Sequence, residues 1–116
     1  MQALPLIPSV VDYAFATTLD GVAYSFRFRW NGRDEAWFFD AFDGDALPIM
    51  YGVKVVLGTN LGRTYDHPLV KTGALMAIDL SGELRDATFD DLGDRVIVVR
   101  LTATEMAAAH AEALAT

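Results

Sequence analysis

The sequence predicts a mainly β fold, either a small antiparallel β-barrel or a two-layer sandwich, that ends in a short C-terminal α-helix. Residues 11–43 alternate apolar and polar side chains between Asp–Gly and Asn–Gly turns, which is the pattern of antiparallel hairpins. Two later apolar runs, 74–80 and 95–101, are rich in strand-forming residues. The tail then changes to strong helix formers. Together these features favour a β-domain closed by a helix.

A length of 116 residues suits one domain. No internal repeat, low-complexity linker or change of composition indicates a boundary. We expect a single domain over 1–116, with an extended arm or edge strand at 1–10, a β-domain at 11–101 and a terminal helix at 102–115. Pro5 and Pro8 in the arm suit an edge strand better than a central one.

The first hairpin turns at Asp20 and Gly21, because a two-residue type I′ turn needs positive φ at both central positions. Counting outward from this turn gives one nearly all-apolar face, and a slip of one residue would mix the two faces. The other face then places Asp12 opposite Arg29 as a cross-strand charge pair. The predicted pairs of the apolar face are Leu19 with Val22, Thr17 with Tyr24, Phe15 with Phe26, Tyr13 with Phe28, and Val11 with Trp30.

The turn "NGRDEA" leads into a third strand. It brings Trp37 opposite Trp30 and Phe39 opposite Phe28, which leaves Arg27 across from Asp40. After the turn "DGD", the segment "LPIMYGVKVVL" resumes as one or two extended pieces, with a bulge or bend expected at Gly52.

The second half of the chain begins with a long loop at 58–73, which is rich in Gly, Thr, Asn and Pro. The runs "ALMAIDL" and "RVIVVRL" are predicted strands, separated by the acidic loop "SGELRDATFDDLGD". Thr102 and Glu105 have the spacing of a capping box, which marks the start of the terminal helix. The apolar face of this helix is thin: Met106, Ala113 and Leu114.

Composition restricts the classes of function. A net charge of -7 opposes binding to a phosphate backbone. The absence of cysteine excludes disulfides, zinc–thiolate sites and cysteine nucleophiles. The start lacks the pattern of a signal peptide and no apolar run is long enough for a membrane span, so we expect use without secretory export. Because 53% of the residues are hydrophobic, some of them are expected to face another chain.

The residues that usually carry catalysis or bind metals show no constellation. His67 lies in a turn before a proline, and His110 lies on the alanine-rich tail without a partner ligand. None of the serines has the context of a nucleophile elbow, and no glycine-rich loop matches a phosphate-binding motif. We expect no catalytic residue, no metal and no cofactor. The serines considered are Ser9, Ser25 and Ser81.

The aspartates cluster in two sets that read as solvated turns. Neither set has the spacing of an EF-hand, and aspartate is common in turns. A pair of carboxylates for glycoside hydrolysis therefore has little support. The sets are Asp40, Asp43 and Asp45, and Asp86, Asp90, Asp91 and Asp94.

Several segments, in their order and spacing, resemble a family of small phage tail proteins, the phage baseplate plug family, whose named example comes from a cyanophage with a contractile tail. The resemblance covers about residues 1–101, from "MQALPLIP" through the hairpins and "PIMYGVKVVLG" to "DDLGDRVIVVRL". The start "PSVVDY" and the alanine-rich tail depart from the family pattern. The matching motif residues are Arg29, Trp30, Asn31, Trp37, Asp40, Gly52, Asp91, Leu92 and Gly93.

The resemblance implies a structural, non-enzymatic virion protein in the tail baseplate, made in the host cytoplasm. Its implied partners are the baseplate hub and the tail-tube proteins, and it would help to close the tube lumen before ejection. We also expect a homo-oligomer, with three copies by analogy with tail hubs. The expected contacts lie on the arm, the 58–73 loop and the terminal helix, through Leu4, Leu6, Ile7, Leu61, Tyr65, Leu69, Met106 and Leu114.

Two other functions stay open. One is a small β-barrel that binds oligosaccharide or single-stranded nucleic acid on an aromatic sheet face. Its platform would consist of Tyr24, Phe26, Phe28 and Trp30, all of which would then be exposed to solvent. The other is a small hydrolase that uses a pair of carboxylates.

Overall fold

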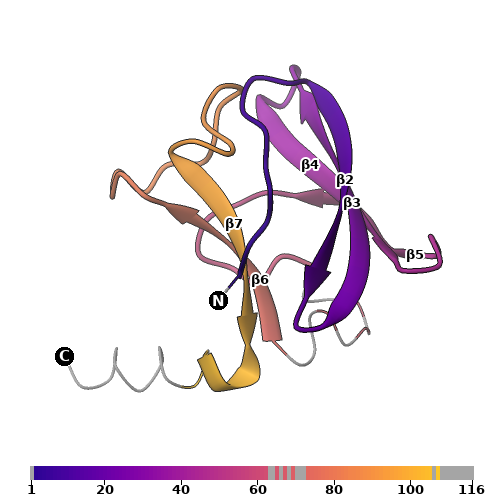
Figure 1. The fold of residues 1–116 in the computed structure, drawn as a ribbon. Coiled ribbons are helices and arrows are strands. Elements are labelled where there is room, and N and C mark those ends of the chain that lie inside the picture. Colours follow the sequence, from indigo (N-terminus) through magenta and orange to yellow (C-terminus); the bar gives the residue numbers. More distant parts are fainter. Residues whose placement is uncertain are drawn as a thin grey trace.

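The computed structural model describes residues 2–62, 65, 67, 69, 73–105 and 107. In this part of the chain seven strands form two antiparallel sheets (Figure 1). One sheet has the order β2-β3-β4-β5 and the other β1-β7-β6. The strands are β1 (Gln2–Ala3), β2 (Asp12–Leu19), β3 (Val22–Asn31), β4 (Ala36–Asp43), β5 (Pro48–Lys54), β6 (Gly73–Asp79) and β7 (Val96–Thr102).

The two sheets share one hydrophobic core but do not close into a barrel. Of the two predicted architectures the sandwich therefore fits, and the barrel does not. The first sheet contributes most of the aromatic rings, among them Phe26, Phe28 and Phe39, which are completely buried. The second contributes aliphatic side chains such as Leu75 and Val98.

The register of the first sheet is as predicted. Asp20 and Gly21 form the turn with φ of 52° and 78°, and every predicted pair from Leu19–Val22 to Tyr13–Phe28 is observed. The outermost predicted pair, Val11 with Trp30, is joined by a hydrogen bond of 2.8 Å from the Trp30 amide to the Val11 carbonyl. Trp30 opposes Trp37, and Phe28 opposes Phe39.

The charge pairs across this sheet differ from those predicted. Asp12 lies opposite Arg29, and Arg27 lies opposite Asp40. The ion pairs, however, run diagonally: Arg27 Nη2 lies 2.6 Å from Asp12 Oδ2, and Arg29 Nη2 lies 2.8 Å from Asp40 Oδ1. Long side chains reach diagonal neighbours across a strand pair, so the register did not determine the partners.

The strand β5 is irregular where a bulge was expected. The residue opposite changes from Val53 at Phe39 to Met50 at Ala41, so two residues, Tyr51 and Gly52, face Asp40 alone. Gly52 has a φ of 60°, a left-handed conformation that glycine adopts without steric cost. The bulge therefore explains a motif glycine within a strand.

The second sheet is built from the predicted late strands and the N-terminal segment. The strands β6 and β7 pair along their whole length, and β1 adds to the outer edge of β7. The amide of Leu4 continues this pairing to the Val98 carbonyl at 2.8 Å. The arm thus includes a short edge strand of its own domain, one of the two expected forms.

The terminal helix begins at Ala103, directly after β7. Its predicted capping box is present: the Thr102 amide donates to Glu105 Oε1 at 3.1 Å, and the Glu105 amide donates to Thr102 Oγ1 at 3.2 Å. These bonds satisfy amide groups that a helix start leaves free. The candidates His110, Met106 and Leu114 lie outside the described residues.

Candidate assembly surfaces

The carboxylate of Asp40 joins three strands of the first sheet. It lies in β4 with a side chain only 8% exposed, and its Oδ1 accepts hydrogen bonds from Arg29 Nη2 in β3 and from the Gly52 amide in β5, both at 2.8 Å. An isolated buried carboxylate is costly, whereas one with two donors is satisfied. Three of the motif residues therefore fix the bulge, and the sheet shape, at this point.

A second group of motif residues joins the first sheet to the 80–95 loop. Trp37 is buried in β4, and its Nε1 donates to the Thr88 carbonyl at 3.1 Å. Trp30 packs against the rings of Trp37 and Phe89, with centroid distances of 5.6 and 5.8 Å, and those two rings stack on each other at 6.1 Å. Asn31 ends β3, and its Oδ1 accepts the Arg33 amide of the following turn at 3.0 Å.

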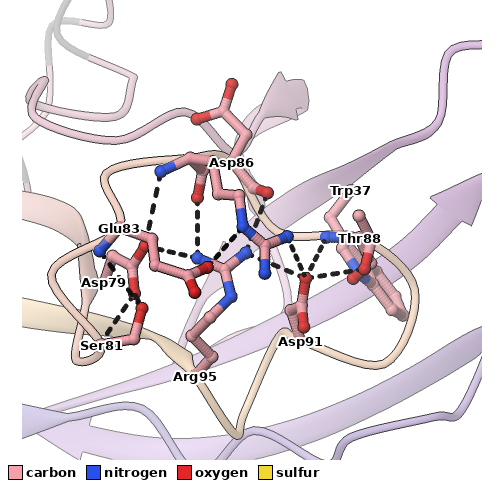
Figure 2. A network of polar contacts seen from close by, with 9 residues as sticks. Trp37, Asp79, Ser81, Glu83, Asp86, Thr88, Asp91 and Arg95 are labelled. Carbon is pink, nitrogen blue, oxygen red and sulfur yellow. Dashed lines mark hydrogen bonds and ion pairs between the residues drawn. The ribbon is translucent and has the colours of Figure 1, made fainter.

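The 80–95 loop is held by a network of carboxylates around Arg95 (Figure 2). Arg95 Nη2 lies 2.9 Å from Asp91 Oδ2, and Nη1 forms an ion pair with Asp79. The same guanidinium donates to the carbonyls of Arg85 and Asp86. Asp91 also accepts the Thr88 amide and hydroxyl. One cation thus links both ends of the loop to its middle.

These contacts change the acidity of the two carboxylates. Hydrogen bonds from Arg95, then from Thr88, hold the pKa of Asp91 far below its usual value. Burial acts to raise the pKa of Asp79, but hydrogen bonds from Ser81 and from the Arg85 amide, together with the charge of Arg95, bring it below the usual value. Both groups are therefore structural anions.

The motif residue Gly93 allows the 80–95 loop to pack closely against the N-terminal arm. Its φ is 94°, and a β-carbon there would lie 3.2 Å from the Pro8 nitrogen and 3.3 Å from Leu6. The preceding residue Leu92 is completely buried. Ser9 Oγ also donates to Asp90 Oδ1 at 2.6 Å. Gly93 and its neighbour Asp90 therefore hold the arm in place.

The predicted interface residues fall into two groups. Leu4, Leu61 and Leu69 are buried in the core of the chain itself, so they offer no surface to a partner in this conformation. Leu6 and Tyr65 are half-buried, whereas Ile7 is 46% exposed. The sequence alone could not separate these groups, because an apolar residue in a loop can be buried in the core of its own chain or against a neighbouring protein.

The surface has two hollows of note. One, of about 770 Å³, lies at the β3–β4 turn beside Arg29, Trp30 and Phe38. The other, of about 420 Å³, lies beside β6 and is bordered mainly by apolar residues. Its walls are Leu57, Gly58, Met76, Ala77, Ile78, Asp79 and Leu84.

The structure contradicts the aromatic platform of the ligand-binding alternative. Tyr24, Phe26 and Phe28 are buried in the core, and Trp30 is half-buried. Base or sugar stacking needs an open ring face, which the second sheet covers. The aromatic residues at every second position of β3 therefore belong to the face that packs in the core.

The described residues also give little support to catalysis or metal binding. Among them, no group of three or more His, Cys, Asp or Glu is placed to hold a metal ion. The hydroxyls of Ser9 and Ser81 each donate to an aspartate at 2.6 Å, and His67 Nδ1 accepts the Leu69 amide. In this described part, neither hydroxyl has a histidine as a hydrogen-bonded base.

A two-sheet β module whose polar networks fix loops and strands belongs to the class of structural and interaction proteins. The family model for the cyanophage baseplate Pam3 plug gp18 matches residues 1–103. The chain therefore belongs to this family of phage baseplate plugs. A search of curated proteins found no match.

Membership places the protein in the tail baseplate of a virion, in association with other phage structural proteins. The structural role of the family suggests a protein that is not an enzyme. In the described part of the chain, we find no helix with the length and apolarity that crossing a membrane requires.

Proposed function

We propose that this baseplate plug associates with the central hub of a contractile tail and helps to close the tail-tube lumen before ejection. The observation that carries the proposal is the family match, which extends over both sheets and the loops between them. The motif residues support it, because Asp40, Gly52 and Gly93 stiffen the module without forming a reactive site.

A plug has to resist deformation, and the fold supports this requirement. The 80–95 loop is tied to the first sheet by Trp37 and to the second by Asp79. Close-packed interiors and networks of hydrogen bonds and ion pairs deform little under load. We infer that the two sheets and this loop act as one rigid body.

The exposed part of the arm is our candidate contact with the hub. Ile7, Val10 and Val11 expose apolar side chains on a segment that Gly93 and Asp90 hold in place. We call these three residues the arm patch. A preformed apolar surface binds at lower entropic cost than a mobile one. Leu6 and Tyr65 are secondary candidates, and Met106 and Leu114 remain proposals from the sequence alone.

The test is the solution mass by light scattering, with the protein alone and mixed with the hub and tail-tube proteins encoded beside it. We expect a defined homo-oligomer and a stable complex with the hub. The double variant Ile7→Asn/Val11→Asn should weaken that complex, whereas Leu47→Asn, at a similarly exposed position on a distant turn, should not. A monomer that joins neither partner would reject the proposal.

A further inference from the structure

The outer face of the first sheet carries a row of two cations and an aromatic ring. Arg29 in β3 lies opposite Phe38 in β4, which in turn lies opposite Lys54 in β5. Side chains at opposed positions of neighbouring strands are close neighbours on one face of the sheet. Phe38 is half-buried and is not part of the core cluster between the sheets. Its ring therefore lies on the outer face, between the two cations.

This row borders the hollow of about 770 Å³ at the β3–β4 turn. Its volume is in the range of ligand pockets, about 300–1,000 Å³. At Gly52 the wall is open, because a β-carbon there would have no atom within 4 Å. Most wall residues are exposed, whereas pockets for small ligands enclose most of the ligand, so a segment of a larger partner fits better. We call it the cationic hollow and define it by Arg29, Trp30, Arg33, Asp34, Phe38 and Gly52.

The cations around this hollow retain donors for a further carboxylate. Arg29 contacts Asp40 through Nη2, its side chain is 41% exposed, and a guanidinium has five N–H donors. Arg33 and Lys54 are exposed, and in the described part of the chain neither forms an ion pair. Asp34 is the one acidic residue among the described walls. The hollow is therefore a cationic site on a chain with a net charge of -7.

We propose that the cationic hollow binds an acidic peptide segment of a neighbouring baseplate protein. Its carboxylates pair with the three cations, and an apolar side chain packs against Trp30 and Phe38. Charge-assisted hydrogen bonds to arginine are strong, and aromatic and arginine side chains are enriched at protein interfaces. At physiological salt, exposed charges are screened beyond about 8 Å, so the cations in the hollow determine the local attraction more than the net charge does.

A nucleic acid is the other polymer that combines negative charge with flat rings. Its phosphates repeat along the whole strand, about 3.4 Å apart, so the strand would continue from the hollow across a predominantly acidic surface. A peptide can place its carboxylates in the hollow alone and be uncharged beyond it. The small extent of the cationic site therefore favours a peptide.

This inference goes beyond the proposed function, because it adds a second contact surface. It needs only the association with other phage structural proteins that family membership implies. The arm patch shares no residue with the cationic hollow. Hub binding and peptide binding are separate measurements, so either proposal can fail while the other stands.

The test measures binding of a synthetic, dye-labelled Glu-Glu-Phe-Glu-Glu peptide to the full chain by fluorescence anisotropy. We expect binding that weakens as salt is added, and much weaker binding of the neutral peptide Gln-Gln-Phe-Gln-Gln. The double variant Arg33→Gln/Lys54→Gln should lower the affinity for the acidic peptide by at least about tenfold. Both side chains are exposed, so this variant should unfold at the same urea concentration as the wild type.

The matched control is Arg27→Gln/Arg85→Gln. It changes the net charge by the same amount, but its two arginines already pair with Asp12 and Glu83, and it should leave the affinity unchanged. Four results would overturn the inference: no binding of the acidic peptide to the wild type, equal binding of the neutral peptide, equal losses in both double variants, or tighter binding of a single-stranded DNA with the same number of charges.

A crosslink in assembled tails gives an independent readout, because the chain has no cysteine. Asp34→Cys places one thiol on the wall of the hollow and keeps all three cations. A short photo-crosslinker attached to this thiol should join a segment rich in aspartate and glutamate in a different baseplate protein, which mass spectrometry would identify. A crosslink to a second copy of this chain, a crosslink to a segment poor in acidic residues, or no product at all would contradict the proposal.

Discussion

Asp40 determines much of the shape of the first sheet, since one carboxylate holds the backbone of β5 in its bulge and pairs with Arg29. The contrast with Asp12 is instructive. Both aspartates pair with an arginine of β3, but the side chain of Asp12 is 44% exposed, whereas that of Asp40 is 8% exposed. The strength of an ion pair depends on solvent as much as on distance.

We therefore expect Asp40→Ala to lower the free energy of unfolding by about 2 kcal/mol, because it leaves the Gly52 amide without an acceptor. The matched variant Asp12→Ala removes an exposed ion pair and should have little effect. Urea denaturation followed by tryptophan fluorescence compares the two. Equal losses for both variants would contradict this account of the bulge.

The depressed pKa of Asp91 predicts sensitivity to acid. A carboxylate whose pKa is lower in the folded state stabilises that state above its unfolded pKa, near 3.8, and this contribution is lost as the pH falls below about 4. Asp91→Asn should lower stability at pH 7 and flatten the decline between pH 5 and pH 3. Asp45→Asn, at an exposed turn, should leave that decline intact, which denaturation at each pH would measure.

The packing of loop against arm is an interaction between two elements that depends on one glycine. Gly93→Ala introduces both an unfavourable positive φ and close contacts with Leu6 and Pro8. Gly82→Ala, at a φ of 78° with no atom within 4 Å of the added carbon, introduces only the first. We expect Gly82→Ala to lower the free energy of unfolding by about 1 kcal/mol. Gly93→Ala should lower it by about 1–2 kcal/mol beyond that amount, because it adds the close contacts.

Hydrogen exchange separates local release of the arm from general destabilisation. In Gly93→Ala the amides of Leu4 and Ile7, which donate to the Val98 carbonyl and the Tyr13 hydroxyl, should exchange faster than those of β3. In Gly82→Ala the exchange rates of these two amides, relative to the rates of the β3 amides, should be unchanged. A uniform increase over the whole chain would show that Gly93 does not position the arm specifically.

The strands could be predicted from the sequence because their information is local. The alternation through Phe26 and Phe28 and the Asp20–Gly21 turn specify the register, and Thr102 with Glu105 specifies the helix start. Local sequence patterns could not distinguish a sandwich from a barrel, because that difference depends on whether the edge strands of the sheets pair with each other.

Contacts between distant segments had weaker signals in the sequence. The network of Asp79, Asp91 and Arg95 joins positions that only the paired strands bring together. Its one local sign is the spacing of Asp79 and Ser81, which is typical of an Asx-turn. Leu84 carried no sign at all, since a leucine in an acidic loop reveals neither its φ nor its exposure.

Across the whole molecule the two sheets depend on one core, so the chain is expected to unfold as a single unit. Both tryptophans lie in β3 and β4, and their fluorescence therefore reports on the first sheet, whereas far-UV circular dichroism reports on all strands. In a two-state transition the two probes coincide. We predict coincident urea curves for the full chain, and two separate curves would show that the sheets are independent.

The same measurement tests whether the N-terminal arm belongs to this unit. Leu4 is buried between the sheets, whereas Ile7, three residues further along the same arm, is largely exposed. Leu4→Ala leaves a cavity and should lower the free energy of unfolding by about 2–4 kcal/mol, with both probes shifting together; Ile7→Ala should change it little. If only the far-UV signal shifted in Leu4→Ala, the arm would stabilise the second sheet alone, and the rigid body proposed for the plug would consist of two parts.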